Sequence, residues 1–156
     1  MRRDVVIRTI GKIPGISFNG IVRETGLSNG VVSHYLIKLM ESKEIEKEDI
    51  KRGKYFLKKI SKKDRIIITH LRQKTNNEIF KLFMKNLNYE KILTQNEISK
   101  KINKSASTVS VSLKVLHKNN IIERIILNKS SKITSDIGYQ ILNRDLYEKL
   151  IIKYNL

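Results

Sequence analysis

The sequence predicts a mainly helical α+β fold with small β wings, built from two similar modules in tandem. Three observations indicate this. A stretch of 30 residues recurs 77 positions further along the chain. In each copy, helical spacing of apolar residues is followed by a pattern typical of a short hairpin. Hydrophobic residues make up 40% of the 156 positions, which is enough for two small cores.

The repeat aligns residues 17–46 with residues 94–123 without a gap. Nine of the 30 pairs are identical, among them Ser28 with Ser105 and Leu36 with Leu113. Two unrelated amphipathic helices can match by chance at their apolar positions. Here the shared positions are cap, turn and core positions together, which favours a duplicated structural unit.

Three helices are predicted in the first module. The first has four apolar residues suited to an inner face: Val5, Val6, Ile10 and Ile13. Ser17 is expected to cap the second helix, and Gly26 to end it in a left-handed turn. Ser28 then caps the third helix, expected over residues 29–43.

A hairpin is predicted after the third helix. Its strands are expected to contain Ile45, Ile50, Tyr55 and Leu57, with a turn at residues 51–54. The acidic residues Glu44, Glu46, Glu48 and Asp49 are interpreted as a solvated face of this hairpin. A helix, a short turn, a longer helix and a two-stranded hairpin together form the winged helix-turn-helix pattern.

The second module is predicted to repeat this order. Residues 75–78 and 94–97 both have capping-box spacing, so each is expected to open a helix. Asn103 replaces Gly26 at the left-handed turn, and Ser105 caps the third helix. The two strands of the second wing are expected at residues 121–127 and 138–142.

Two further helices are expected to flank the second module. One covers residues 61–71, and the other follows Asn143 with an apolar face made of Leu146, Leu150, Ile151 and Tyr154. The predicted organisation is therefore an N-terminal module over residues 1–60, a helical linker over 61–73 and a C-terminal module with its last helix over 74–156.

The third helix of each module carries the predicted DNA-contacting surface. Short and polar residues in its N-terminal turns let a helix approach the major groove closely, whereas an ordinary solvated face would hold long Glu and Lys side chains. The candidates in the first module are Ser28, Asn29, Gly30, Ser33, His34 and Lys38. Those in the second module are Lys104, Ser105, Ser107, Ser110 and Lys114.

The hairpin turns are expected to supply positive charge. Lys51, Arg52 and Lys54 surround Gly53 at the first turn, an arrangement that suits contact with phosphates or with the minor groove. Lys129 and Lys132 occupy the corresponding region of the second wing. The alternative for all of these side chains is that they are simply solvated.

The net charge of +17 favours a polyanionic partner, because a small protein keeps such a charge at a cost in self-repulsion. Both halves share it: residues 1–60 hold 13 basic and 7 acidic residues, and residues 61–156 hold 19 and 8. A lysine-rich proteome is the alternative explanation for the charge.

No enzymatic activity, cofactor or metal site is predicted. The sequence has no cysteine, and its seven glycines form no phosphate-binding loop. The histidines His34, His70 and His117 lack the spacing of metal ligands, so His70 and His117 are interpreted as packing or solvated residues. No signal peptide or membrane span is recognised, and a cytoplasmic, nucleoid-associated location is expected.

At residues 14–36 the chain resembles the archaeal and bacterial winged-helix regulators related to the MarR and ArsR groups, and in particular the first module of archaeal tandem regulators. The resemblance covers most of residues 4–57. Over residues 74–154 it is looser and is carried by Thr108, Val109, Ser110, Leu113 and Leu116, with Asn103 and Val111 departing from the pattern. It implies sequence-specific binding of double-stranded DNA that controls transcription.

Two other functions remain open from the sequence. The apolar C-terminal helix also suits a tandem winged-helix scaffold for protein assembly, and the charge also suits a non-specific chromatin or basal transcription factor. A homodimer formed through the linker helix or the last helix is one expected arrangement, and a monomer, whose single chain already holds two recognition helices, is the other.

Overall fold

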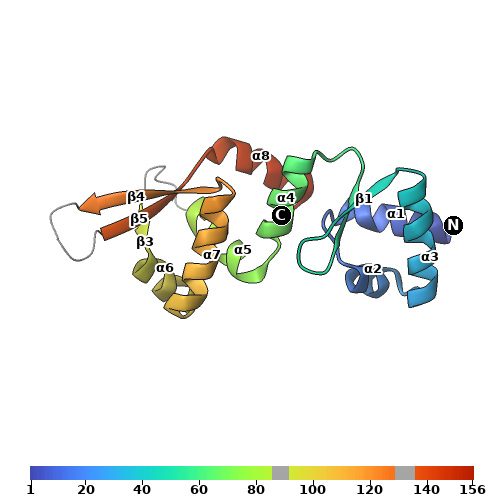
Figure 1. Ribbon diagram of the computed structural model, residues 1–156, viewed down its shortest axis with the longest axis horizontal. Coiled ribbons are helices and arrows are strands. Elements are labelled where there is room, and N and C mark those ends of the chain that lie inside the picture. The colour runs from blue at the N-terminus through green and yellow to red at the C-terminus, as the bar shows by residue number, and fades with distance from the viewer. Residues whose placement is uncertain (86–91, 129–135) are drawn as a thin grey trace. The chain divides into compact units, whose positions relative to one another are not determined.

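The computed structural model describes residues 1–85, 92–128 and 136–156 (Figure 1). Its helices are α1 (Arg2–Lys12), α2 (Phe18–Thr25), α3 (Asn29–Glu41), α4 (Lys62–Leu71), α5 (Lys74–Lys85), α6 (Gln95–Ile102), α7 (Ala106–Lys118) and α8 (Arg144–Tyr154). Its strands are β1 (Ile45–Glu48), β2 (Lys54–Leu57), β3 (Leu93–Thr94), β4 (Ile122–Asn128) and β5 (Asp136–Ile141). The contacts divide the chain into two compact units, Met1–Thr69 with Leu150–Leu156, and His70–Lys149.

The first module packs α1, α2 and α3 together beside the antiparallel β1–β2 hairpin (Figure 1). Its core is made of apolar side chains that recur at helical spacing, and β1 adds one more. These buried residues include Val6, Ile10, Ile21, Val32, Leu36, Leu39 and Ile45. Burial of this set offsets much of the entropy cost of ordering three short helices, none of which is long enough to be stable alone in water.

Local capping residues fix where these helices begin and end. The Ser17 hydroxyl accepts a hydrogen bond from the Gly20 amide at 3.1 Å, and the Ser28 hydroxyl accepts one from the Val31 amide at 3.4 Å. Gly26 ends α2 with a φ of 68°, and a Cβ at this position would meet no atom within 4 Å. The glycine is therefore required by backbone conformation and not by space.

The second module repeats this frame. Helices α6 and α7 begin and end 77 residues after α2 and α3, as the sequence repeat predicts. Thr94 and Glu97 form a complete capping box, and Asn103 adopts the left-handed conformation with a φ of 53°. In the sheet of order β3-β5-β4, Leu93 pairs with Tyr139. The two tandem winged helix-turn-helix modules predicted from the sequence are thus confirmed.

Several local expectations are wrong. Ile50, expected in a strand of the first hairpin, lies in neither β1 nor β2. Val5 lies on the exposed side of α1, while Ile7 joins Val6 and Ile10 at the core. Helix α5 starts at Lys74, one residue before the expected cap, and the buried Asn76 side chain donates to the His70 carbonyl. In α8 the buried positions are Tyr147, Leu150 and Tyr154, and Leu146 is exposed.

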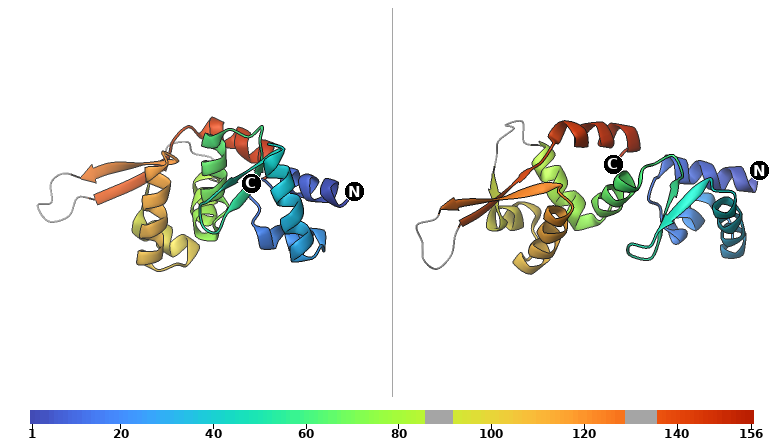
Figure 2. Two further views of the ribbon diagram at one scale, coloured as in Figure 1. Left: turned by 45° about the vertical axis from the view of Figure 1, so that its right-hand side comes forward. Right: turned by 45° about the horizontal axis from the view of Figure 1, so that its top comes forward.

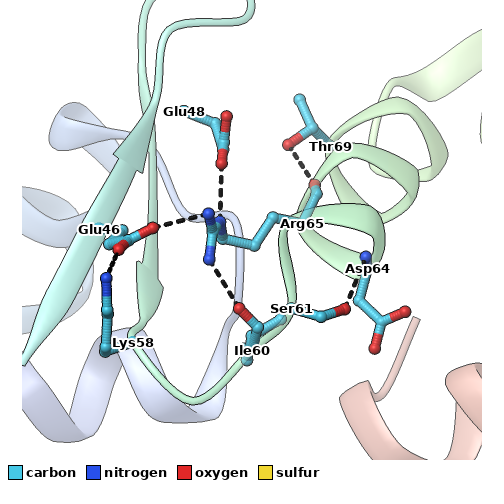
Figure 3. A network of polar contacts seen from close by, with 8 residues as sticks. All are labelled: Glu46, Glu48, Lys58, Ile60, Ser61, Asp64, Arg65 and Thr69. Carbon is cyan, nitrogen blue, oxygen red and sulfur yellow. Dashed lines mark hydrogen bonds and ion pairs between the residues drawn. The ribbon is translucent and has the colours of Figure 1, made fainter.

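The expected solvated acidic face is also wrong for Glu46 and Glu48, whereas Asp49 is exposed. Arg65 on α4 is 7% exposed and lies between the carboxylates of Glu46 and Glu48, at 2.6 and 2.7 Å (Figure 3). Its third contact is a 2.7 Å hydrogen bond donated to the carbonyl of Ile60, and Lys58 also pairs with Glu46. The planar guanidinium thus joins β1 to the helix that follows the hairpin.

Candidate nucleic-acid interface

The N-terminal half of α3 presents a polar surface to solvent. Val32, Leu36 and Leu39 form the buried stripe of this helix, so the residues on the opposite side point outward. All six candidates of the first module are exposed: Ser28, Asn29, Gly30, Ser33, His34 and Lys38. A Cβ at Gly30 would meet no atom within 4 Å, so nothing inside the module obstructs a close approach to this turn.

Helix α7 presents the corresponding surface in the second module. Its buried stripe contains Val109, Leu113 and Leu116. The candidates Ser105, Ser107 and Lys114 are exposed, and Lys104 and Ser110 are half-buried. The Ser105 hydroxyl lies 2.8 Å from that of Thr108 and 3.1 Å from that of Ser107. These hydroxyls gather at the amino end of the helix, where the helix dipole favours anionic groups.

The first wing has a tight basic turn. Lys51, Arg52 and Gly53 have φ angles of 44°, 71° and 76°, and the first two are exposed. Lys54, already in β2, is half-buried. A Cβ added to Gly53 would lie 2.4 Å from the Cε of Lys47, whose ammonium pairs with Asp49 at 3.1 Å. The backbone of this turn is therefore packed closely against the Lys47 side chain, while the side chains of Lys51 and Arg52 are exposed.

The hairpin loop and the start of α3 lie on the same side of the first module, the lower side in all three views (Figures 1 and 2). The predicted groove-reading turns and the basic turn are therefore within one module face. In the second module, Lys129 and Lys132 lie outside the described residues, so their place relative to α7 stays a prediction.

Two exposed apolar residues on these helices were not among the predicted DNA contacts, although Val111 was noted as a departure from the family pattern. Val111 on α7 is 65% exposed, and Ile37 on α3 is 51% exposed. The repeat itself holds the signal for Val111, because this residue aligns with His34 of the first module. An apolar side chain at this position suits contact with the methyl group of thymine.

The described residues were also compared with the requirements of a metal site and of a membrane-spanning helix. Among them, no three His, Asp or Glu side chains are grouped as metal ligands would be. Within the same ranges, no helix has both the length and the apolar character needed to cross a membrane. Two of the histidines make local contacts. One ring nitrogen of His117 lies 3.4 Å from the Ile122 carbonyl, and the backbone carbonyl of His70 accepts a hydrogen bond from the side-chain amide of Asn76.

These features define a tandem winged helix-turn-helix protein, and the comparison with known families agrees. A family model described as an N-terminal helix-turn-helix domain matches residues 1–68. A second, described as winged helix-turn-helix DNA-binding, matches residues 89–123. The chain thus carries two helix-turn-helix modules, and the second matches a winged helix-turn-helix model described as DNA-binding.

Solved structures show more distant likeness. A possible transcriptional regulator from Methanosarcina mazei Go1 is 22% identical over 70% of this chain and 85% of its own, with a TM-score of 0.46. ScpB from Mycobacterium tuberculosis is 10% identical over 95% and 94%, with a TM-score of 0.35. No curated protein sequence is significantly similar to the chain. The assignment therefore rests on the family models and on the geometry of the modules.

Proposed function

We propose that this protein is a sequence-specific regulator of transcription that binds double-stranded DNA. In this proposal the N-terminal turns of α3 and α7 enter the major groove, and the basic wings contact the backbone. The observation that carries it is the pair of exposed, small-residue helix starts, capped by Ser28 and Ser105 and repeated 77 positions apart. Winged-helix domains typically bind and do not catalyse, and we propose the same for this chain.

The charge supports this assignment. A net charge of +17 shared by both modules supplies the cations that neutralise phosphates. If about 6–8 phosphates are neutralised, the logarithm of affinity falls with the logarithm of salt concentration at a slope of about −5 to −7. A slope near zero would contradict duplex binding through these surfaces.

Selection from a random duplex library, followed by fluorescence anisotropy with the selected and a scrambled duplex, tests sequence specificity. Regulators with specific sites typically bind them about 10³-fold or more tightly than other DNA. Equal affinity for both duplexes would refute specific regulation and favour an architectural role.

Variants separate the roles of the wing and the helix. Arg52→Glu is expected to weaken binding to selected and scrambled duplexes alike, because it places a negative charge at the exposed turn. Arg8→Glu makes the same charge change at an exposed position of α1 and is the matched control. His34→Ala and Asn29→Ala are expected to reduce the preference between the duplexes more than the affinity for scrambled DNA. Identical losses from all of these variants would refute this division.

A further inference from the structure

A pocket of about 250 Å³ lies between α7 and the β4–β5 hairpin of the second module. Its helical wall is formed by Ser110, Lys114 and His117, which are spaced i, i+4 and i+7 and share one helix face. Its other wall is the sheet face that carries Arg124 and Tyr139, which are opposite each other in the β4–β5 register. The pocket is therefore a product of helix and strand periodicity and not of an irregular loop.

The lining has the chemistry of an anion site. Lys114 and Arg124 contribute two positive charges, no carboxylate lines the pocket, and neither cation has an ion pair among the described residues. The hydroxyls of Ser110 and Tyr139 add two further hydrogen-bond donors. Leu113, which is fully buried, and Ile137 give the same pocket an apolar part.

The first module shares Ser33 and Leu36 with this lining, at the places of Ser110 and Leu113, but not the rest. By the 77-residue repeat, Phe18, Ile37 and Met40 occupy the places of Gln95, Lys114 and His117. Phe18 and Met40 pack against the hydrophobic core of that module. Lys47 occupies the place of Arg124, but its ammonium is paired with Asp49 at 3.1 Å. The winged-helix frame therefore forms without these cations, and their presence in the second module needs a reason other than folding.

We propose that this pocket binds a small organic oxyanion, a carboxylate or a phosphate monoester. The anionic group lies between Lys114 and Arg124, and the organic part rests on Ile137, beside the buried Leu113. The size agrees with this occupant, because one water needs about 10–15 Å³ of cavity volume measured in the same way, and 250 Å³ therefore accommodates more than an anionic group alone.

The pocket also couples ligand binding to DNA binding, and this part of the inference rests on the proposed function. Ser110 and Lys114 line the pocket and are at the same time candidate DNA contacts of α7. A ligand that occupies their hydrogen-bonding groups and neutralises the lysine removes contacts from the duplex. Ligand and DNA are therefore expected to compete for the second module.

Direct binding is tested first, by isothermal titration calorimetry of the full chain without DNA. The probes are phenyl phosphate, benzoate and inorganic phosphate, each at constant ionic strength. Saturable binding of an organic probe is expected, and Arg124→Gln should weaken it about tenfold, as the loss of a charge-assisted hydrogen bond does. Lys118→Gln removes one charge from the exposed end of the same helix, outside the pocket, and should change affinity less than about twofold.

Three results overturn the proposal: no saturable binding up to about 10 mM probe, binding of inorganic phosphate alone, or equal losses in the two variants. Because Arg124 is exposed, its replacement is expected to leave the circular dichroism spectrum unchanged. Tyr139→Phe, which removes only a hydroxyl, is a second variant expected to weaken the probes.

A second arm measures duplex binding during titration with phenyl phosphate. The expected result is displacement from the wild-type protein and much weaker displacement from Arg124→Gln. If Arg124→Gln weakens duplex binding while no free anion binds, the pocket belongs to the DNA backbone contact and the proposal fails. If the probes bind but no duplex does, the proposed function fails and the pocket assignment stands.

Discussion

Replacing Arg65 by methionine tests whether the contact between the first hairpin and α4 depends on charge. Methionine keeps much of the length of the arginine stem but cannot donate hydrogen bonds. In the wild type the guanidinium donates to Glu46, Glu48 and the Ile60 carbonyl, and all three contacts are 2.6–2.7 Å long (Figure 3). The variant removes them together.

The expected cost follows from what remains in the variant. Glu46 retains Lys58 as a partner, whereas Glu48, whose side chain is 15% exposed, has no other ion pair among the described residues. Breaking a buried pair from one side typically costs about 3–5 kcal/mol, because a charge is left without a partner in a poorly solvated place. Since one of the two carboxylates is still paired, we expect a value at the lower end, about 3 kcal/mol.

Urea unfolding followed by circular dichroism measures this change, and hydrogen exchange of the β1 and β2 amides assigns it to the first module. Adding Glu48→Met to Arg65→Met should restore part of the loss, because both charges are then absent. A loss below about 1 kcal/mol for Arg65→Met, or strictly additive losses in the double variant, would refute the argument.

The remaining predictions concern turns, caps and base contacts. Gly26→Ala should destabilise the first module by about 1 kcal/mol in the same urea assay. Gly26→Asn should cost less, because Asn103 already adopts this left-handed conformation in the second module. Equal costs for the two variants would contradict the backbone explanation. Thr94→Ala should cost the second module about 1 kcal/mol through loss of the capping box, and an unchanged thermal midpoint of that module would contradict it. Substituting deoxyuridine for thymine in a selected duplex should weaken binding of the wild type but not of Val111→Ser, as measured by anisotropy; equal weakening of both would place the methyl contact elsewhere.

Local signals in the sequence were sufficient to predict where most of the helices begin and end. Serine and threonine caps and a left-handed residue after α2 and α6 depend on neighbours within four positions, so their patterns survive without tertiary information. The exposure of Ser33 followed in the same way from the buried stripe of α3. Its role in binding DNA stays a prediction.

Features that depend on distant contacts were not predicted. Glu46 and Glu48 looked like solvated acids, because their partner Arg65 is on another element and its burial is invisible in a strand pattern. The spacing at Thr75 suggested a cap, but the buried Asn76 amide contacts the His70 carbonyl and sits inside the first turn. The pocket could not be predicted from the sequence, because it depends on the register of β4 and β5, which places Arg124 opposite Tyr139.

The two modules share the central apolar positions of their helices and differ in much of what they expose. Of the nine identical pairs in the repeat, five are buried in both modules, for example Ile21 with Ile98 and Leu36 with Leu113. Several differences fall at outward positions, where Val111 replaces His34 and Lys114 replaces Ile37. Because exposed substitutions cost little stability, the frame permits the surfaces to diverge. The two modules are therefore expected to differ in the bases they contact, and only the second is expected to couple DNA binding to an oxyanion.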